Sequence, residues 1–173
     1  RAHALPSSVS DPGLGAVGHP ARPSAAKEWR RVGFEVTLAP VDEFGTGDLA
    51  KLEEAIRPDT VFIGGMAANN EVGTLQPVKE IAALAKARGI AFFTDAVQAA
   101  GVLKLDVKEL GVDMMSFSGH KFYGPKGVGV LYVKSGVKIY PAMTGGHQER
   151  MKRGGTANVT AIVGMRGAFG PAE

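Results

Sequence analysis

One lysine, Lys121, stands between two apolar runs of the sequence. Residues 112–117 are typical of a buried strand, and residues 128–133 are typical of a neighbouring strand. An ammonium group is costly to remove from water unless it is paired or neutral, so burial lowers the pKa of a lysine. A neutral amine is the nucleophile that condenses with the aldehyde of pyridoxal 5′-phosphate. Lys121 is therefore a candidate anchor for that cofactor, and a solvated loop lysine beside Tyr123 is the alternative.

Other polar side chains follow the carboxyl ends of predicted strands: Asn70, Asp95, Gln98, Ser118 and His120. An open parallel sheet binds its ligands outside the carboxyl ends of its strands, so we expect these side chains to converge on one crevice. A pyridoxal phosphate enzyme also needs a carboxylate that keeps the pyridine nitrogen protonated, and Asp95 suits that task. Ser118 and His120 would donate hydrogen bonds near the cofactor phosphate.

Single residues of this set have structural interpretations. Asp95 alone is typical of an Asx-turn or a helix cap, and Asn70 alone is typical of a turn. Their joint appearance at three strand ends is what favours a shared site.

The elements that would position these residues alternate along the chain. Helices are expected at residues 24–31, 47–56, 77–88, 105–110 and 159–169, and strands at 34–38, 60–64, 90–94, 112–117 and 129–133. This alternation predicts parallel βαβ units with helices on both faces of a sheet.

Residues 1–18 have no sustained hydrophobic period and are expected to be irregular or disordered. Within them, residues 13–18 spell G-x-G-x-x-G. A dinucleotide loop needs a strand before this spelling and a helix after it, and the prolines on both sides argue against that context.

Composition limits the possible functions. The net charge is +3 and the basic residues are scattered, so no nucleic-acid surface is expected. The absence of cysteine and the wide spacing of the four histidines argue against a metal site. No apolar run reaches the roughly 18 residues of a spanning helix. Residues 1–6 lack the apolar core of a secretory signal, and a cytoplasmic location is expected.

Four motifs then occur in a fixed order: Asn69-Asn70-Glu71-Val72-Gly73, Thr94-Asp95-Ala96-Val97-Gln98, Ser118-Gly119-His120-Lys121-Phe122-Tyr123-Gly124-Pro125-Lys126-Gly127, and Gly145-Gly146-His147-Gln148-Glu149-Arg150 followed by Arg153-Gly154-Gly155-Thr156. Over about residues 19–166 the chain resembles the cysteine desulfurases, which belong to the class V aminotransferase superfamily of fold-type I pyridoxal phosphate enzymes. The resemblance implies an α/β fold, a partial large domain of the fold-type I transferases with a mainly parallel sheet flanked by helices.

The resemblance also assigns roles to residues. It implies that Lys121 bonds the cofactor aldehyde, that Asp95 pairs with the pyridinium, and that Gln98 hydrogen-bonds the ring-hydroxyl side. Ser118 and His120 resemble the phosphate ligands of the family.

Three further residues are assigned only by this resemblance. Asn70 resembles the asparagine at the cofactor and substrate edge, and His19 resembles a histidine stacked on the pyridine face; a solvated loop histidine is the alternative. Thr156 resembles a threonine that reaches the phosphate of the other subunit, which implies a homodimer with shared active sites. An N-cap of the last helix is the alternative role for Thr156.

The resemblance is incomplete. A desulfurase uses a cysteine on a mobile loop, and the 173 residues contain none. The family's substrate-binding arginine and its first phosphate loop are also missing. We therefore expect residues 19–173 to be an incomplete large domain from a truncated or rearranged reading frame.

Three functions stay open. The first is a desulfurase that converts L-cysteine to L-alanine and passes the sulfur to an acceptor. A separate protein could serve as that acceptor. The second is a selenocysteine lyase or another class V aminotransferase. The third is an inactive remnant or interaction fragment.

Overall fold

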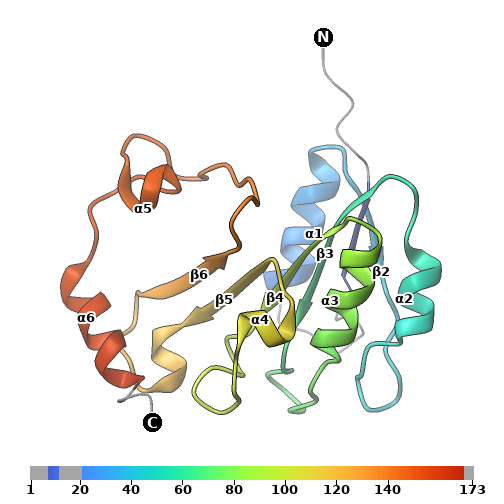
Figure 1. The fold of residues 1–173 in the computed structure, drawn as a ribbon, viewed down its shortest axis with the longest axis horizontal. Helices are drawn as coiled ribbons and strands as arrows, with labels where there is room; N and C mark the ends of the chain where they lie inside the picture. The colour runs from blue at the N-terminus through green and yellow to red at the C-terminus, as the bar shows by residue number, and fades with distance from the viewer. Residues whose placement is uncertain (1–7, 12–20, 170–173) are drawn as a thin grey trace.

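A six-stranded sheet organises the chain in the computed structural model, which describes residues 8–11 and 21–169 (Figure 1). Its strands are β1 Ser8–Asp11, β2 Glu35–Leu38, β3 Thr60–Met66, β4 Ala91–Asp95, β5 Met114–Ser118 and β6 Gly129–Val133. The strand order is β2-β1-β3-β4-β5-β6, and every pair is parallel except β5 with β6. The predicted α/β class and mainly parallel sheet are therefore confirmed.

Helices lie on both faces of the sheet, as predicted (Figure 1). They are α1 Ala21–Arg31, α2 Leu49–Ala55, α3 Val78–Ala87, α4 Val107–Leu110, the 3-10 helix η1 Gly119–Phe122, α5 Gln148–Met151 and α6 Val159–Ala168. Neighbouring residues of β3 show the two faces, because Ile63 belongs to the core cluster with α2 and α3 while Phe62 packs with Ala26 of α1. None of the described helices has the length and apolar character needed to cross a membrane.

The helix α3 follows directly from local sequence signals. Val78, Ile81, Ala82 and Ala85 are buried along one side, at the spacing of one helical face. Pro77 stands at its N-cap, and Gly89 ends the segment with a φ of +67° that favours glycine.

The strand β1 contradicts the expectation that residues 1–18 are irregular. Ser8–Asp11 pair in parallel with β2 on one side and with β3 on the other. Four residues with only one apolar side chain carry too weak a pattern for prediction, and the strand forms because two neighbours supply its hydrogen-bond partners. A strand and helix α1 therefore do flank the G-x-G-x-x-G spelling at residues 13–18, which itself lies outside the described residues.

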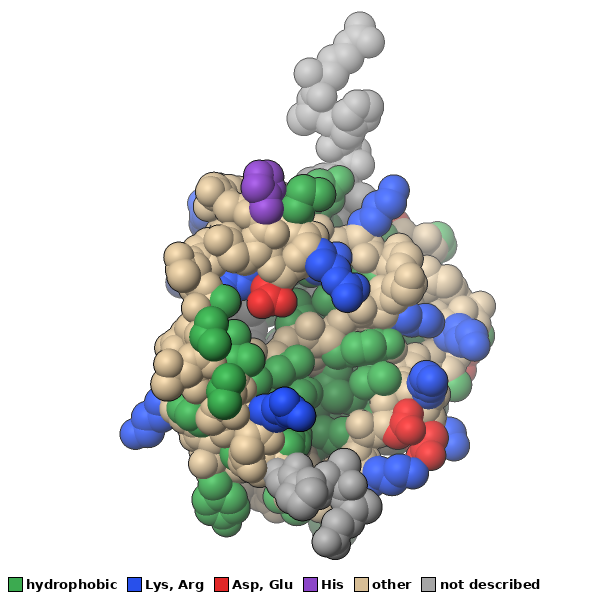
Figure 2. Space-filling view, turned by 60° about the vertical axis from the view of Figure 1, so that its left-hand side comes forward, with side chains coloured by type: hydrophobic (Ala, Val, Ile, Leu, Met, Phe, Trp, Pro, Cys, Tyr) green, Lys and Arg blue, Asp and Glu red, His purple; other side chains and the backbone are tan. Residues whose placement is uncertain are grey.

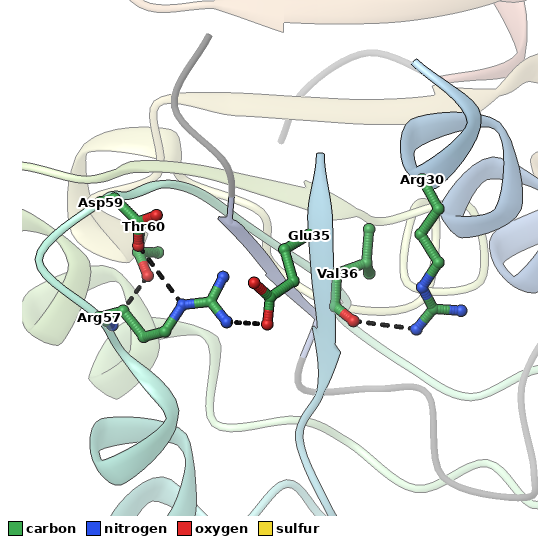
Figure 3. Close-up of polar contacts among 6 residues, drawn as sticks. All are labelled: Arg30, Glu35, Val36, Arg57, Asp59 and Thr60. Carbon is green, nitrogen blue, oxygen red and sulfur yellow. Dashed lines mark hydrogen bonds and ion pairs between the residues drawn. The ribbon is translucent and has the colours of Figure 1, made fainter. Parts of the chain in front are cut away.

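A polar cluster joins elements at the amino edge of the sheet (Figure 3). The Arg57 guanidinium contacts the Glu35 carboxylate at the start of β2 and lies 3.4 Å from Asp59 Oδ1. The hydrogen bond that the Arg57 guanidinium donates to the Glu35 carboxylate is the main cause that holds the pKa of Arg57 above its ordinary value. The backbone N–H of Arg57 donates to Thr60 Oγ1 at 2.9 Å. These contacts fix the turn into β3 at the edge opposite the candidate site.

Candidate active site

Strand register brings the predicted site segments to one edge of the sheet. Met66 pairs with Asp95, and Asp95 pairs with Ser116. The ladder continues past the strand ends, because Ala67 N–H donates to Asp95 O and Ala96 N–H donates to Ser116 O, both at 2.8 Å. The segments that leave β3, β4 and β5 therefore start side by side, as the sequence predicted.

Asp95 is the last residue of β4 and is half-buried. Its Oδ1 accepts a hydrogen bond from Val97 N–H at 3.0 Å, so the Asx-turn interpretation of Asp95 is correct. This bond uses one carboxylate oxygen and fixes the carboxylate at the strand end. No described residue hydrogen-bonds the other oxygen. Gln98 lies half-buried in the turn that follows.

Asn70 lies in a turn that its neighbour builds. Asn69 Oδ1 accepts from the backbone N–H groups of Glu71 at 2.7 Å and Val72 at 3.1 Å. Asn70 Nδ2 donates to Glu71 Oε1 at 2.6 Å. Asn70 Oδ1 is buried and has no hydrogen-bond partner among the described residues. A buried acceptor without a donor is unfavourable in a finished site, and a bound donor would satisfy it.

The lysine segment follows β5 without a break. Ser118 ends the strand half-buried, and His120 and Lys121 lie on the 3-10 helix η1. Both side chains are exposed, which agrees with the alternative of a solvated lysine beside Tyr123 and not with a buried amine. The reason is the short turn: Phe122 is the residue that points into the core, and it leaves its neighbours Lys121 and Tyr123 on the outside.

Backbone contacts hold this turn in place, and sequence reasoning missed the residues that make them. Gly119 N–H donates to Val128 O and Gly124 N–H donates to Gly119 O, each at 2.9 Å. A Cβ at Gly124 would lie 2.8 Å from Gly119 O, closer than side chains tolerate. Tyr123 closes the turn with a left-handed φ of 66°. The glycines inside the lysine motif were the available signal.

Two predicted residues are not brought to this edge by described contacts. Thr156 is exposed in the loop before α6. It is not the cap of α6, because Asn158 is the N-cap and its Oδ1 accepts from Ala161 N–H at 3.1 Å. His19 lies outside the described residues.

The donor set at this edge suits pyridoxal phosphate. Asp95 offers a carboxylate for a pyridinium, Ser118 and His120 offer groups for a phosphate, and Lys121 offers an exposed amine for an aldehyde. The unsatisfied Asn70 Oδ1 supports the same fit, because a ring or substrate donor would supply the hydrogen bond that it lacks. No group of three or more metal-binding side chains exists among the described residues.

This open, mostly parallel sheet, with a lysine turn after β5 and an antiparallel β6, has the fold of the large domain of fold-type I pyridoxal phosphate enzymes. The sequence matches the aminotransferase class-V family over residues 14–170. The chain belongs to the aminotransferase class-V family.

Similar proteins carry desulfurase names. The chain is 56% identical over 133 residues to the cysteine desulfurase IscS of Methanosarcina thermophila, covering 77% of this chain and 33% of that protein. It is 47% identical over 143 residues to the mitochondrial cysteine desulfurase of Saccharomyces cerevisiae, covering 82% of this chain and 29% of that protein. The chain thus spans about a third of the length of these curated relatives.

Solved structures give the same picture. A NifS-like protein superposes with a TM-score of 0.90 at 40% identity, covering 96% of this chain and 45% of that chain. The structure of SspA in complex with cysteine superposes with a TM-score of 0.89 at 37% identity, covering 94% of this chain and 47% of that chain. The resemblance inferred from the motifs is confirmed.

Proposed function

We propose that this chain forms the cofactor-binding part of a pyridoxal phosphate enzyme that removes sulfur from L-cysteine. The observation that carries the proposal is the gathering of Asn70, Asp95 and Ser118 at one sheet edge beside the Lys121 turn. The similarity to proteins named cysteine desulfurase supports the choice of substrate.

Each residue has a defined task in this proposal. When bound, pyridoxal phosphate supplies an aldehyde that holds an amino acid and a ring that withdraws electrons from its Cα. Lys121 Nζ holds the aldehyde and then moves the proton at the substrate Cα. The Asp95 carboxylate keeps a proton at the pyridine nitrogen, and Gln98 binds the ring-hydroxyl side. Ser118 and His120 bind the phosphate.

Two residues complete the proposed site. Asn70 orients the substrate edge through its unsatisfied Oδ1. His19 would cover the pyridine face.

The proposed reaction balances with an external thiol. L-cysteine and an acceptor thiol give L-alanine and an acceptor persulfide: the Cβ–S bond breaks, a sulfur–sulfur bond forms, and the substrate Cβ gains a proton. The acceptor must come from outside these residues because the 173 residues contain no cysteine. A sulfur-acceptor protein in the cytoplasm is the partner we propose.

We propose a homodimer as the working form. Figure 2 turns the side of the molecule that carries α5 and α6 toward the viewer. Hydrophobic side chains gather on this face. Exposed apolar residues of this region include Leu131, Met151, Val159 and Val163. A contiguous apolar surface is typical of a region that another protein surface covers. Thr156 lies in the same region and would reach the partner's phosphate.

Cofactor trapping tests the proposal. The purified chain is mixed with pyridoxal phosphate, reduced with borohydride, and digested for mass spectrometry. We expect the cofactor on Lys121, and its loss in Lys121→Ala but not in Lys126→Ala, which removes another exposed lysine of the same motif. Label spread evenly over surface lysines would refute the site. Alanine and sulfide release from L-cysteine with added thiol, compared with L-selenocysteine, then tests the reaction and its substrate.

A further inference from the structure

Two segments that carry the proposed cofactor residues meet at Gly101. This glycine lies in the turn that follows Asp95 and contains Gln98, and it has a left-handed φ of +80°. A Cβ at Gly101 would lie 2.6 Å from Phe122 Cβ and 3.7 Å from Phe122 Cα. Carbon atoms do not approach to 2.6 Å without a bond, so only glycine permits this contact.

Phe122 has no room to move away from Gly101. It is 4% exposed and packs in a core cluster with Ala100 and Met165. Its ring centroid lies 4.3 Å from that of Phe169 and 6.0 Å from that of Phe117. A Cβ at position 101 would therefore displace the backbone of η1 rather than a flexible side-chain end.

This displacement would also move Lys121, which precedes Phe122 on the same short turn. We propose that Gly101 is a positioning residue for Lys121. Its missing Cβ sets the spacing between the lysine turn and the segment that carries Asp95 and Gln98. The inference rests on the proposed function, because the spacing matters only if these residues share one cofactor.

The test compares two glycine substitutions in the full 173-residue chain. Gly101→Ala adds a left-handed alanine and the clash with Phe122. Gly89→Ala adds a left-handed alanine at φ +67°, where a Cβ meets nothing within 4 Å in the described part of the chain. Both variants carry the same kind of backbone penalty, so a difference between them reports the clash.

Two measurements are made on each variant. The first is the yield of borohydride-trapped pyridoxal phosphate on Lys121. A misplacement of roughly 1 Å can lower a reaction between aligned groups by on the order of 100-fold, so we expect at least about a tenfold loss in Gly101→Ala and little change in Gly89→Ala. The second, which needs no cofactor, is hydrogen exchange of the Tyr123 and Gly124 N–H groups, which both donate to Gly119 O. We expect faster exchange only in Gly101→Ala.

The outcomes separate this inference from the proposed function. Equal labelling and equal exchange in the two variants would overturn the positioning role. No label on Lys121 in the unaltered chain would overturn the proposed function. The positioning role would fall with it, even if hydrogen exchange shows that Gly101 holds the turn. If Gly101→Ala does not fold, Phe122→Leu replaces it. This variant keeps an apolar side chain against Met165 and loosens the turn. Unchanged labelling and unchanged hydrogen exchange in Phe122→Leu would also overturn the positioning role.

Discussion

Thr94 offers the sharpest test of the packing. Its side chain is fully buried, at 0% exposure, and its hydroxyl has no hydrogen-bond partner among the described residues. Thr60 is a matched control at 7% exposure, because its hydroxyl accepts from Arg57 N–H at 2.9 Å. Threonine and valine have nearly the same shape, so Thr94→Val and Thr60→Val change polarity and leave the packing volume almost unchanged.

The expected effects have opposite signs. A buried polar group without a partner costs about 1–3 kcal/mol, so Thr94→Val should raise the free energy of unfolding by about 1–2 kcal/mol. Thr60→Val removes the acceptor of a backbone N–H and should lower it by about 1 kcal/mol. For a chain of this size, each kcal/mol shifts the melting temperature by roughly 2–4 °C.

Urea unfolding followed by circular dichroism measures both variants. The slope of free energy against urea should stay constant, so that the midpoints report stability alone. Thr94→Val should also leave cofactor labelling intact, since Thr94 and Asp95 point to opposite faces of β4. A fall in stability of Thr94→Val, similar to that of Thr60→Val, would refute the reasoning and would mean that the Thr94 hydroxyl has a partner in solution.

Two further predictions concern helix caps. Asn158→Ala should lower the free energy of unfolding by about 1 kcal/mol because Asn158 caps α6, whereas Thr156→Ala should leave it unchanged; equal losses in urea melts would contradict the assignment of the cap. Hydrogen bonds from the backbone N–H groups of Glu109 and Lys108 hold the pKa of Asp106 below its ordinary value of 3.8. The stability that these bonds provide is therefore present above pH 3.8 and is lost as the pH falls through the lower pKa of the folded state. Asp106→Asn should therefore flatten the fall of the urea midpoint at acid pH, and a fall equal to that of the unaltered chain would refute this.

Local signals account for the parts of the fold that the sequence predicted. The apolar face of α3, with proline before it and glycine after it, is readable because period and caps agree within one segment. The convergence of Asn70, Asp95 and Ser118 was also predictable, because parallel strands must end at the same edge. Their motifs also indicated the family to which the chain belongs.

Features that depend on tertiary pairing were not readable. The strand β1 forms because β2 and β3 flank it, and its own four residues carry almost no hydrophobic pattern. The exposure of Lys121 has a similar origin. The two apolar runs around it left a buried and a solvated lysine both possible, and the structure exposes it because Phe122 takes the inward position on η1 and packs against residues of the neighbouring turn and α6.

The contact between Gly101 and Phe122 explains why a motif can predict candidate site residues without giving their geometry. Each residue lies in its own segment, Gly101 in the turn after β4 and Phe122 on η1. Nothing in either segment alone requires a missing Cβ at position 101, because the requirement comes from the close approach of the two backbones. Types and order of the functional residues are thus local properties of this chain. Their spacing is a property of the packing between strand ends, and the packing is where substitutions that touch no ligand should still weaken cofactor attachment.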